Sequence, residues 1–216
     1  MLFRSRRRVL DAAARRVLDA PLARAAGVLD RPGISPDRIT AASLVLGLAS
    51  AGAAAAAEWL PALVLWLASR LADGLDGPLA RRREAAGRPG DAGAGGFFDI
   101  TADFCVYGSG VLGVALGVVR TTDAPWEPFA AVLLAYYVNG AAFLAFSSLA
   151  ERAGRQLDDG RSLSFLGGLA EGTETVVVHA LWLLLPAIAW QVAWVWAVVV
   201  RISAAHRMWA GHRALR

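Results

Sequence analysis

The chain contains two aspartate-bearing stretches, Asp73-Gly74-Leu75-Asp76-Gly77-Pro78-Leu79-Ala80-Arg81 and Gly95-Gly96-Phe97-Phe98-Asp99-Ile100-Thr101-Ala102-Asp103. Each stretch adjoins a long apolar run, where an acidic group is costly to desolvate. Four carboxylates that gather at one place need a neutralising cation. Carboxylate-held Mg²⁺ commonly binds phosphate or diphosphate groups. The two stretches therefore predict a metal site for a phosphorylated substrate, and a structural ion-pair network with Arg70 is the alternative.

The first stretch has helical spacing. At about 100° per residue its key positions fall within an arc of roughly 140° and share one face: Asp73, Asp76, Gly77, Ala80 and Arg81. Asp99 and Asp103 lie one turn apart on the next predicted helix. Gly77 and Ala80 leave their face nearly bare, so a ribose or a planar group can approach the backbone. Arg81 is placed to meet a phosphate oxygen.

The combined pattern is Asp-x-x-Asp-Gly-x-x-Ala-Arg followed by Gly-x-x-x-Asp-x-x-x-Asp, and it resembles the signature of the CDP-alcohol phosphatidyltransferases. All eight signature residues are present. The spacer between Arg81 and Gly95 has thirteen residues, whereas the family usually has eight. Gly90 stands at the usual distance, but Ala94 would then replace an aspartate, so Gly95 is the better match. We expect the extra residues to lengthen a Gly- and Ala-rich loop over 84–96.

The resemblance implies a membrane enzyme that transfers a phosphatidyl group from a CDP-linked lipid, usually CDP-diacylglycerol, to an alcohol acceptor with release of CMP. It also implies a homodimer. Mg²⁺ or Mn²⁺ would be held by Asp73, Asp76 and Asp99. Asp103 would be the general base on the acceptor hydroxyl and is included among the metal ligands.

The resemblance also assigns a nucleotide-diphosphate pocket to five residues: Gly77, Ala80, Arg81, Gly95 and Thr40. Thr40 ends Ser35-Pro36-Asp37-Arg38-Ile39-Thr40, which is similar to a Thr-Pro-Asn-x-x-Thr stretch of the family, with Asp37 in place of Asn. The same residues also have helix-start chemistry, with Ser35 as the cap and Pro36 in the first turn. Both interpretations of this stretch stand.

Composition places the chain in a membrane, since 56% of its residues are hydrophobic and its mean hydropathy is +0.47. We predict an all-α membrane protein with a six-transmembrane-helix bundle over residues 38–207. The predicted spans are Thr40–Ala57, Trp59–Leu79, Phe97–Val119, Phe129–Leu149, Leu163–Leu185 and Ala187–Ala205. A basic amphipathic segment over 1–37 precedes them, along the cytoplasmic leaflet or as a solvated arm, and a basic tail over 208–216 follows.

Arginine accounts for all the basic charge other than histidine, and it is unevenly distributed. Nine arginines precede the first predicted span, whereas the loops predicted on the opposite side carry only Arg120. The positive-inside rule then places both termini and the aspartates in the cytoplasm, most simply of a bacterial inner or plasma membrane. The sequence pI of about 10.2 is interpreted as attraction to lipid headgroups rather than nucleic-acid binding.

Glu171 and Glu174 share one face of the fifth predicted span, where they either line an acceptor site or pack against a neighbouring helix. Acidic lining favours a neutral polyol or a cationic amino alcohol over a phosphate monoester. His179 and Arg201 are interpreted as structural.

Two other functions remain open at this point. One is a Mg²⁺-dependent intramembrane prenyltransferase, although its motif lacks Gly-x-x-Ala-Arg. The other is a non-enzymatic divalent-cation carrier, in which Arg81 would repel the ion.

Overall fold

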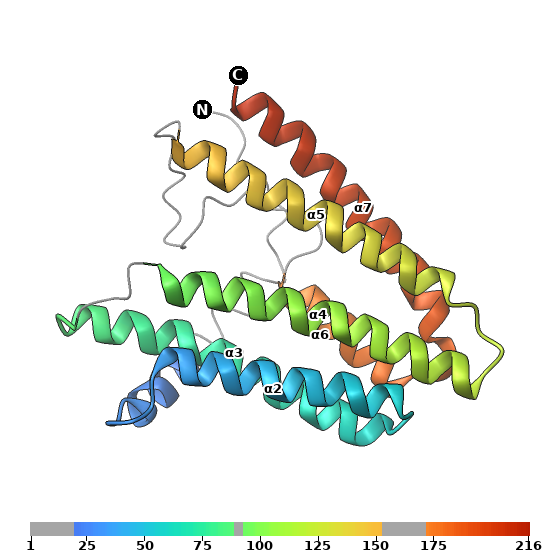
Figure 1. The fold of residues 1–216 in the computed structure, drawn as a ribbon, viewed down its shortest axis with the longest axis horizontal. Coiled ribbons are helices and arrows are strands. Elements are labelled where there is room, and N and C mark those ends of the chain that lie inside the picture. The colour runs from blue at the N-terminus through green and yellow to red at the C-terminus, as the bar shows by residue number, and fades with distance from the viewer. Residues whose placement is uncertain (1–19, 89–92, 153–171) are drawn as a thin grey trace.

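A computed structural model of the chain describes residues 20–88, 93–152 and 172–216, which form helices joined by loops, with no strand in these ranges. After a short helix over Ala20–Leu29, the elements are α2 (Pro36–Ala55), α3 (Trp59–Ala85), α4 (Ala94–Thr121), α5 (Glu127–Arg152), α6 (Gly172–Leu184), the 3₁₀ turn η1 (Pro186–Ile188) and α7 (Ala189–Ala214). Figure 1 shows their arrangement. The predicted all-α class is confirmed.

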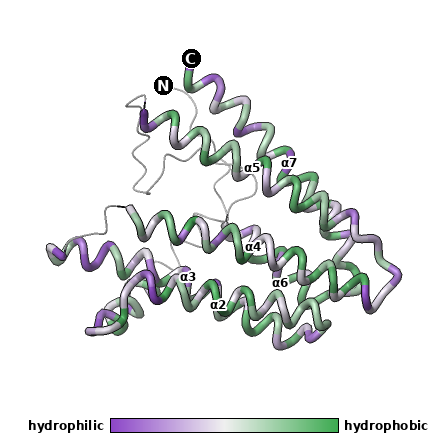
Figure 2. Tube along the Cα trace, viewed as in Figure 1, coloured by the Kyte–Doolittle hydropathy of each residue, from purple (hydrophilic) through white to green (hydrophobic). Residues whose placement is uncertain are grey.

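Four of the described helical segments are long and apolar enough to cross a membrane: α2, α4, α5 and η1 with α7. Figure 2 shows apolar residues along these helices and polar residues at several of their ends. The helix α3 is 27 residues long, but it carries the polar residues of the first aspartate stretch. The predicted fifth span begins at residue 163, and only its part from Gly172 onward lies in the described region. The described residues thus include four helical segments that could span a membrane by length and composition, and the count of six spans stays a prediction.

The helices α2 and α4 pack closely because glycines face the contact. A Cβ on Gly113 would overlap the carbonyl of Ala51, and one on Gly117 would overlap the carbonyl of Ala54. The helix α2 also packs on α3, while α5 pairs with α7 and α3 contacts α6. In Figure 1 the α5–α7 pair lies above α4 at an angle and approaches it at the right of the view. The two aspartate stretches thus lie on helices that both pack against α2.

The helix boundaries refine the sequence predictions. Ser35 caps α2, since its Oγ accepts a 3.2 Å hydrogen bond from the backbone N–H of Arg38, which confirms the helix-start interpretation. The loop predicted over 84–96 is shorter, because α3 continues to Ala85 and α4 begins at Ala94. Gly87 and Gly93 in this connection have φ angles of 71° and 100°, which favour glycine. The stretch predicted as a basic tail over 208–216 is helical as far as Ala214, where α7 ends. Of the predicted amphipathic N-terminal segment, residues 1–19 lie outside the described residues.

Asp30 lies in the linker before α2 and forms ion pairs with arginines at and just beyond the C-terminal end of α3. Its side chain is only 12% exposed. Its carboxylate accepts hydrogen bonds from Arg83 at 3.1 Å and Arg88 at 2.8 Å, and it lies 3.4 Å from Arg82. These cations hold the pKa of Asp30 below its usual value, with the Arg83 hydrogen bond as the largest cause. The contacts fix the approach of the chain to α2 at the same end of α3 that bears the aspartates.

Candidate metal and substrate site

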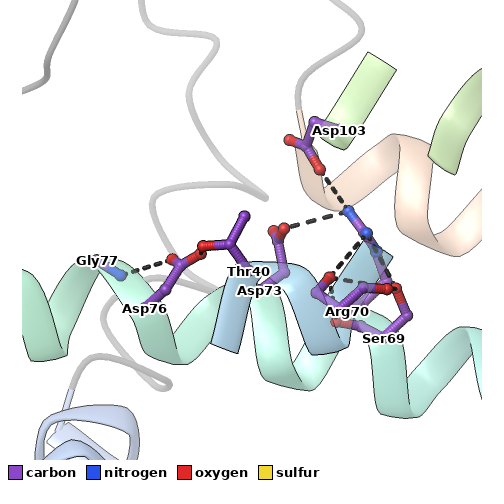
Figure 3. A network of polar contacts seen from close by, with 8 residues as sticks. Thr40, Ser69, Arg70, Asp73, Asp76, Gly77 and Asp103 are labelled. Carbon is purple, nitrogen blue, oxygen red and sulfur yellow. Dashed lines mark hydrogen bonds and ion pairs between the residues drawn. The ribbon is translucent and has the colours of Figure 1, made fainter. Parts of the chain in front are cut away.

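The carboxylate of Asp76 is buried on α3, and each of its two oxygens accepts a hydrogen bond. Its Oδ2 accepts a 2.6 Å hydrogen bond from the hydroxyl of Thr40 on α2, and its Oδ1 accepts one of 2.6 Å from the backbone N–H of Gly77. Figure 3 shows both contacts. Both oxygens are thereby oriented before any ligand arrives. In metal sites such outer contacts fix the direction of the ligand's lone pairs.

Three of the four predicted carboxylates converge. Asp73 and Asp76 from α3 and Asp99 from α4 each offer one oxygen, and these oxygens lie within 4.8 Å of one another. Anionic oxygens at such separations repel one another unless a cation lies between them. Three hard oxygen donors suit Mg²⁺ or Mn²⁺, which complete their coordination with water and substrate phosphates. The donor set therefore fits the metal that the sequence predicts.

Asp103 does not join this group and pairs with Arg70 instead. Nη1 of Arg70 donates a 2.7 Å hydrogen bond to Oδ1 of Asp103 and lies 3.6 Å from Oδ2 of Asp73 (Figure 3). The sequence spacing had suggested only the second of these contacts. The guanidinium of Arg70 thus lies between Asp73, one of the three converging carboxylates, and Asp103.

The side chain of Arg70 is only 6% exposed, and its guanidinium has several partners, although its Nε has no hydrogen-bond partner among the described residues. Its Nη2 donates to the hydroxyl of Ser43 at 3.3 Å and to that of Ser69 at 3.1 Å. Its guanidinium carbon lies 5.2 Å from the ring centroid of Trp66 and 4.9 Å from that of Tyr107. Aromatic faces and hydroxyls of this kind stabilise a cation that has left water. Arg70 is therefore a fixed charge rather than a mobile surface arginine.

The residues predicted to shape a nucleotide pocket differ in their exposure to solvent. Ala80 and Arg81 are exposed, and a Cβ on Gly77 would lie 3.3 Å from Nη1 of Arg81, so the guanidinium folds over the bare glycine. Gly95 lies in the first turn of α4 and is partly exposed. Thr40 is buried and bonded to Asp76. The geometry gives Thr40 a direct part in orienting a carboxylate.

The predicted acceptor residues are described only in part, because Glu171 lies outside the described residues. Glu174 stands in the first turn of α6, and its Oε2 is buried with no hydrogen-bond partner among the residues that the structure describes. An acceptor group can use such an oxygen, since a buried acceptor left without a donor is costly.

Two features of the interior were missed from the sequence. Arg207, assigned to the region after the last span, is 7% exposed and its guanidinium lies 5.7 Å from the ring centroid of Phe143. Buried residues recur every three or four positions along α7, and Arg207 stands at one of these positions. This spacing was the sequence signal that could have indicated its burial. Arg201 is exposed on the same helix.

The second feature is a buried aromatic cluster around His179. The imidazole stacks on Trp66 at 4.7 Å between ring centroids, and its Nε2 lies 3.1 Å from the hydroxyl of Tyr136. That hydroxyl also accepts a 2.7 Å hydrogen bond from Nε1 of Trp196. The cluster joins α3, α5, α6 and α7 behind Arg70 and supports the structural interpretation of His179.

Comparisons with known proteins identify the family of the chain. The family model for CDP-alcohol phosphatidyltransferase matches residues 34–203. The chain is 38% identical over 195 residues to the inner membrane protein YnjF of Escherichia coli strain K12, covering 88% of each chain. Its fold is similar to that of phosphatidylinositol phosphate synthase (PgsA1) from Mycobacterium tuberculosis, solved with CDP-DAG bound. That likeness has a TM-score of 0.68 and 19% identity, and it covers 88% of this chain and 92% of the other. The chain belongs to the CDP-alcohol phosphatidyltransferase family, a family of membrane enzymes of phospholipid synthesis.

Proposed function

We propose that this enzyme transfers a phosphatidyl group from CDP-diacylglycerol to an alcohol acceptor and releases CMP. The observation that carries the proposal is the convergence of Asp73, Asp76 and Asp99, which stand at signature positions of the family. The similarly folded synthase was solved with CDP-DAG bound, which supports the same class of donor here.

In the proposed reaction the acceptor hydroxyl attacks the phosphorus that carries diacylglycerol. Asp103 accepts the hydroxyl proton as the new O–P bond forms. The bond from that phosphorus to the oxygen shared with CMP breaks, and CMP leaves with the electron pair. Arg81 meets the diphosphate and offsets the charge that develops on it.

Asp73, Asp76 and Asp99 would hold Mg²⁺ or Mn²⁺. When bound, the ion supplies charge neutralisation for the diphosphate and for the departing CMP. The geometry supports these three ligands better than a set that includes Asp103, whose Oδ1 is bonded to Arg70.

For the acceptor we propose a neutral polyol or a cationic amino alcohol. The support is the buried Oε2 of Glu174, together with the prediction that Glu171 shares its face. A phosphate monoester would be repelled by this acidic lining. Glu174→Gln is expected to raise the acceptor KM about tenfold and to leave the donor KM unchanged.

The proposed setting is a bacterial inner membrane with six spans and a cytoplasmic site. The relative YnjF is an inner membrane protein. The helix α3 exposes Leu60, Val64, Leu67 and Leu71 along one face, as a lipid-facing span does despite its polar end. We also propose a homodimer, on the resemblance of the sequence to the family.

The test is an acceptor screen with purified protein, Mg²⁺ and CDP-diacylglycerol labelled in the diacylglycerol. The expected result is a labelled phospholipid whose headgroup is one of the added neutral or amino alcohols. A prenyl diphosphate and an ion-flux assay run in parallel test the two functions left open by the sequence. Pyrophosphate release from the prenyl substrate, or ion transport without phospholipid product, would contradict the proposal.

A further inference from the structure

We propose that the linker before α2 forms a binding site for the phosphate group of an acidic phospholipid. A pocket of about 470 Å³ opens between this linker, the first turn of α2 and the C-terminal end of α3, and its charged lining consists of Asp30, Arg31, Arg38, Arg83 and Arg88. Its size falls within the range of roughly 300–1,000 Å³ that is typical of small-molecule sites. The pocket shares no lining residue with the aspartate site or with the predicted nucleotide pocket.

Contacts with the linker hold three of the arginines in place. Asp30 accepts a 3.1 Å hydrogen bond from Nε of Arg83 and a 2.8 Å hydrogen bond from Nη1 of Arg88. Nη1 of Arg38 donates to the backbone carbonyl of Gly33, which also lines the pocket. These guanidiniums are therefore oriented before a ligand arrives, which reduces the cost of binding.

The pocket retains positive charge that its own residues do not offset. Asp30 is the one acidic residue that lines it, against four arginines. Each guanidinium has five N–H donors, and Asp30 takes up only one nitrogen of Arg88. The exposed side chain of Arg31 forms no hydrogen bond or ion pair within the described part of the chain. Guanidiniums with free donors bind phosphate oxygens through paired N–H···O bonds.

The position of the pocket favours a lipid as the source of the phosphate. Gly33 and Ser35 line it, and α2, which is long and apolar enough to span a membrane, begins at Pro36. Val45 follows Arg38 by seven residues, so it lies within about 20° of it on the same face of α2 and about 10 Å further along the helix. Val45 is 64% exposed. A lipid whose phosphate contacts Arg38 can therefore lay an acyl chain along this apolar face.

The charge of the pocket selects the class of lipid. The arginine distribution predicts that this end of α2 is cytoplasmic, and acidic phospholipids give that leaflet a negative surface potential. A zwitterionic headgroup carries a cation of its own, which the arginines would repel. The occupant is therefore a phospholipid with net negative charge, and phosphatidylglycerol is a suitable probe.

The test is a calorimetric titration of the purified full chain in neutral detergent with short-chain phosphatidylglycerol. Saturable binding is expected, at least about tenfold tighter than that of short-chain phosphatidylcholine. Equal affinity for the two lipids would overturn the proposal. Because no CDP-diacylglycerol is present, a protein that binds the probe and releases no CMP in the transfer assay would refute only the proposed function.

Paired variants locate the binding. Arg31→Gln/Arg38→Gln should raise the dissociation constant at least about tenfold, since it removes two charged hydrogen-bond donors. Arg24→Gln/Arg216→Gln removes the same charge from exposed positions outside the pocket and should have little effect. Equal weakening in the two double variants would indicate attraction to the basic surface in general and would overturn the site.

Two single variants complete the set. Arg31→Glu reverses a charge at a side chain with no described contact to lose, so it keeps the test decisive if the double variant does not fold. Unchanged affinity in Arg31→Glu would contradict the proposal. Arg81→Gln should bind the probe as the wild type does, and a loss of binding there would place the lipid at the proposed donor site instead.

Inorganic phosphate distinguishes the two sources of the anion. It should bind at least about 100-fold more weakly than phosphatidylglycerol, because it buries no acyl chain. Equal affinity for inorganic phosphate, lost in Arg31→Gln/Arg38→Gln, would assign the pocket to a soluble phosphate and overturn the lipid assignment.

Discussion

Thr40 and Asp76 belong to different helices and are joined by a 2.6 Å hydrogen bond between buried side chains. The same Asp76 carboxylate is one of three that converge on the proposed metal position. Thr40 stands where the sequence predicts a nucleotide contact, and the structure shows it orienting an acidic group. The opening turns of α2 are thus linked to the metal site through a single hydroxyl.

Thr40→Val removes that hydroxyl and keeps the shape of the side chain. Loss of an outer hydrogen bond to a metal ligand typically weakens metal affinity about 10- to 100-fold. The Mg²⁺ concentration for half-maximal activity should therefore rise at least about tenfold. Thr40→Ser is the matched control and should stay within about twofold of the wild type. An unchanged Mg²⁺ requirement in Thr40→Val would show that the bond has no part in metal binding.

Asp76→Asn removes a charge at nearly constant volume. Turnover should fall to background because the amide is a poor ligand for Mg²⁺, and excess chelator should have the same effect on the wild type. The control is Asp123→Asn, since Asp123 is exposed in the loop between α4 and α5 and should leave activity unchanged. Full wild-type activity in excess chelator would contradict a divalent-metal mechanism.

Gly113→Ala tests the close packing of α2 on α4. The added Cβ meets the carbonyl of Ala51, and overpacking of this kind costs about 1–3 kcal/mol. The thermal unfolding midpoint in detergent should fall. Gly108→Ala on the same helix is the control, because a Cβ there has no heavy atom within 4 Å. It should hold or raise the midpoint, since alanine favours helix over glycine by up to about 1 kcal/mol. Equal midpoints for the two variants would refute the packing argument.

Asp30→Asn tests the attachment of the α2 linker to α3. Arginines lower the pKa of Asp30 in the folded protein. The charged carboxylate therefore stabilises the fold fully at any pH above the ordinary carboxylate pKa. This stabilisation is lost as the pH falls through the lowered pKa. At pH 7 the variant should unfold at a lower temperature and its linker should be cut faster by protease. Asp37→Asn, an exposed neighbour, is the control. Unaltered protease sensitivity in Asp30→Asn would argue against a fastening role.

Membrane orientation can be measured with single cysteines. In a Cys105→Ser background, Ala85→Cys places a thiol at the exposed last residue of α3, and Thr122→Cys places one at an exposed position just after α4. The arginine distribution predicts labelling of residue 85 from the cytoplasm and of residue 122 from the other side. Labelling of both from the same side would contradict the six-span proposal.

Local spacing in the sequence was enough to predict several features. The helical face of the first aspartate stretch, the cap at Ser35, the start of α3 at Trp59 and the loop before α4 all follow from patterns within a few residues. Such patterns depend on backbone geometry that neighbouring residues share. They were sufficient to indicate which aspartates could face one site.

The pairing of side chains across helices could not be predicted. The spacing of Arg70 and Asp73 suggested their contact, whereas the stronger bond to Asp103 depends on how α3 and α4 are rotated against each other. The same holds for Thr40 with Asp76 and for the buried place of Arg207. One sequence without the packing of its helices does not determine which of several nearby charges pair.

The proposed activity is phosphatidyl transfer from CDP-diacylglycerol at the aspartate site. The most direct measurement is the stoichiometry of products when purified protein, Mg²⁺ and doubly labelled CDP-diacylglycerol are mixed with the best acceptor of the screen. One CMP released per phosphatidyl–acceptor molecule is predicted, with both products absent in Asp76→Asn. CMP release that is independent of the acceptor, or phospholipid product that persists in folded Asp76→Asn, would contradict the account.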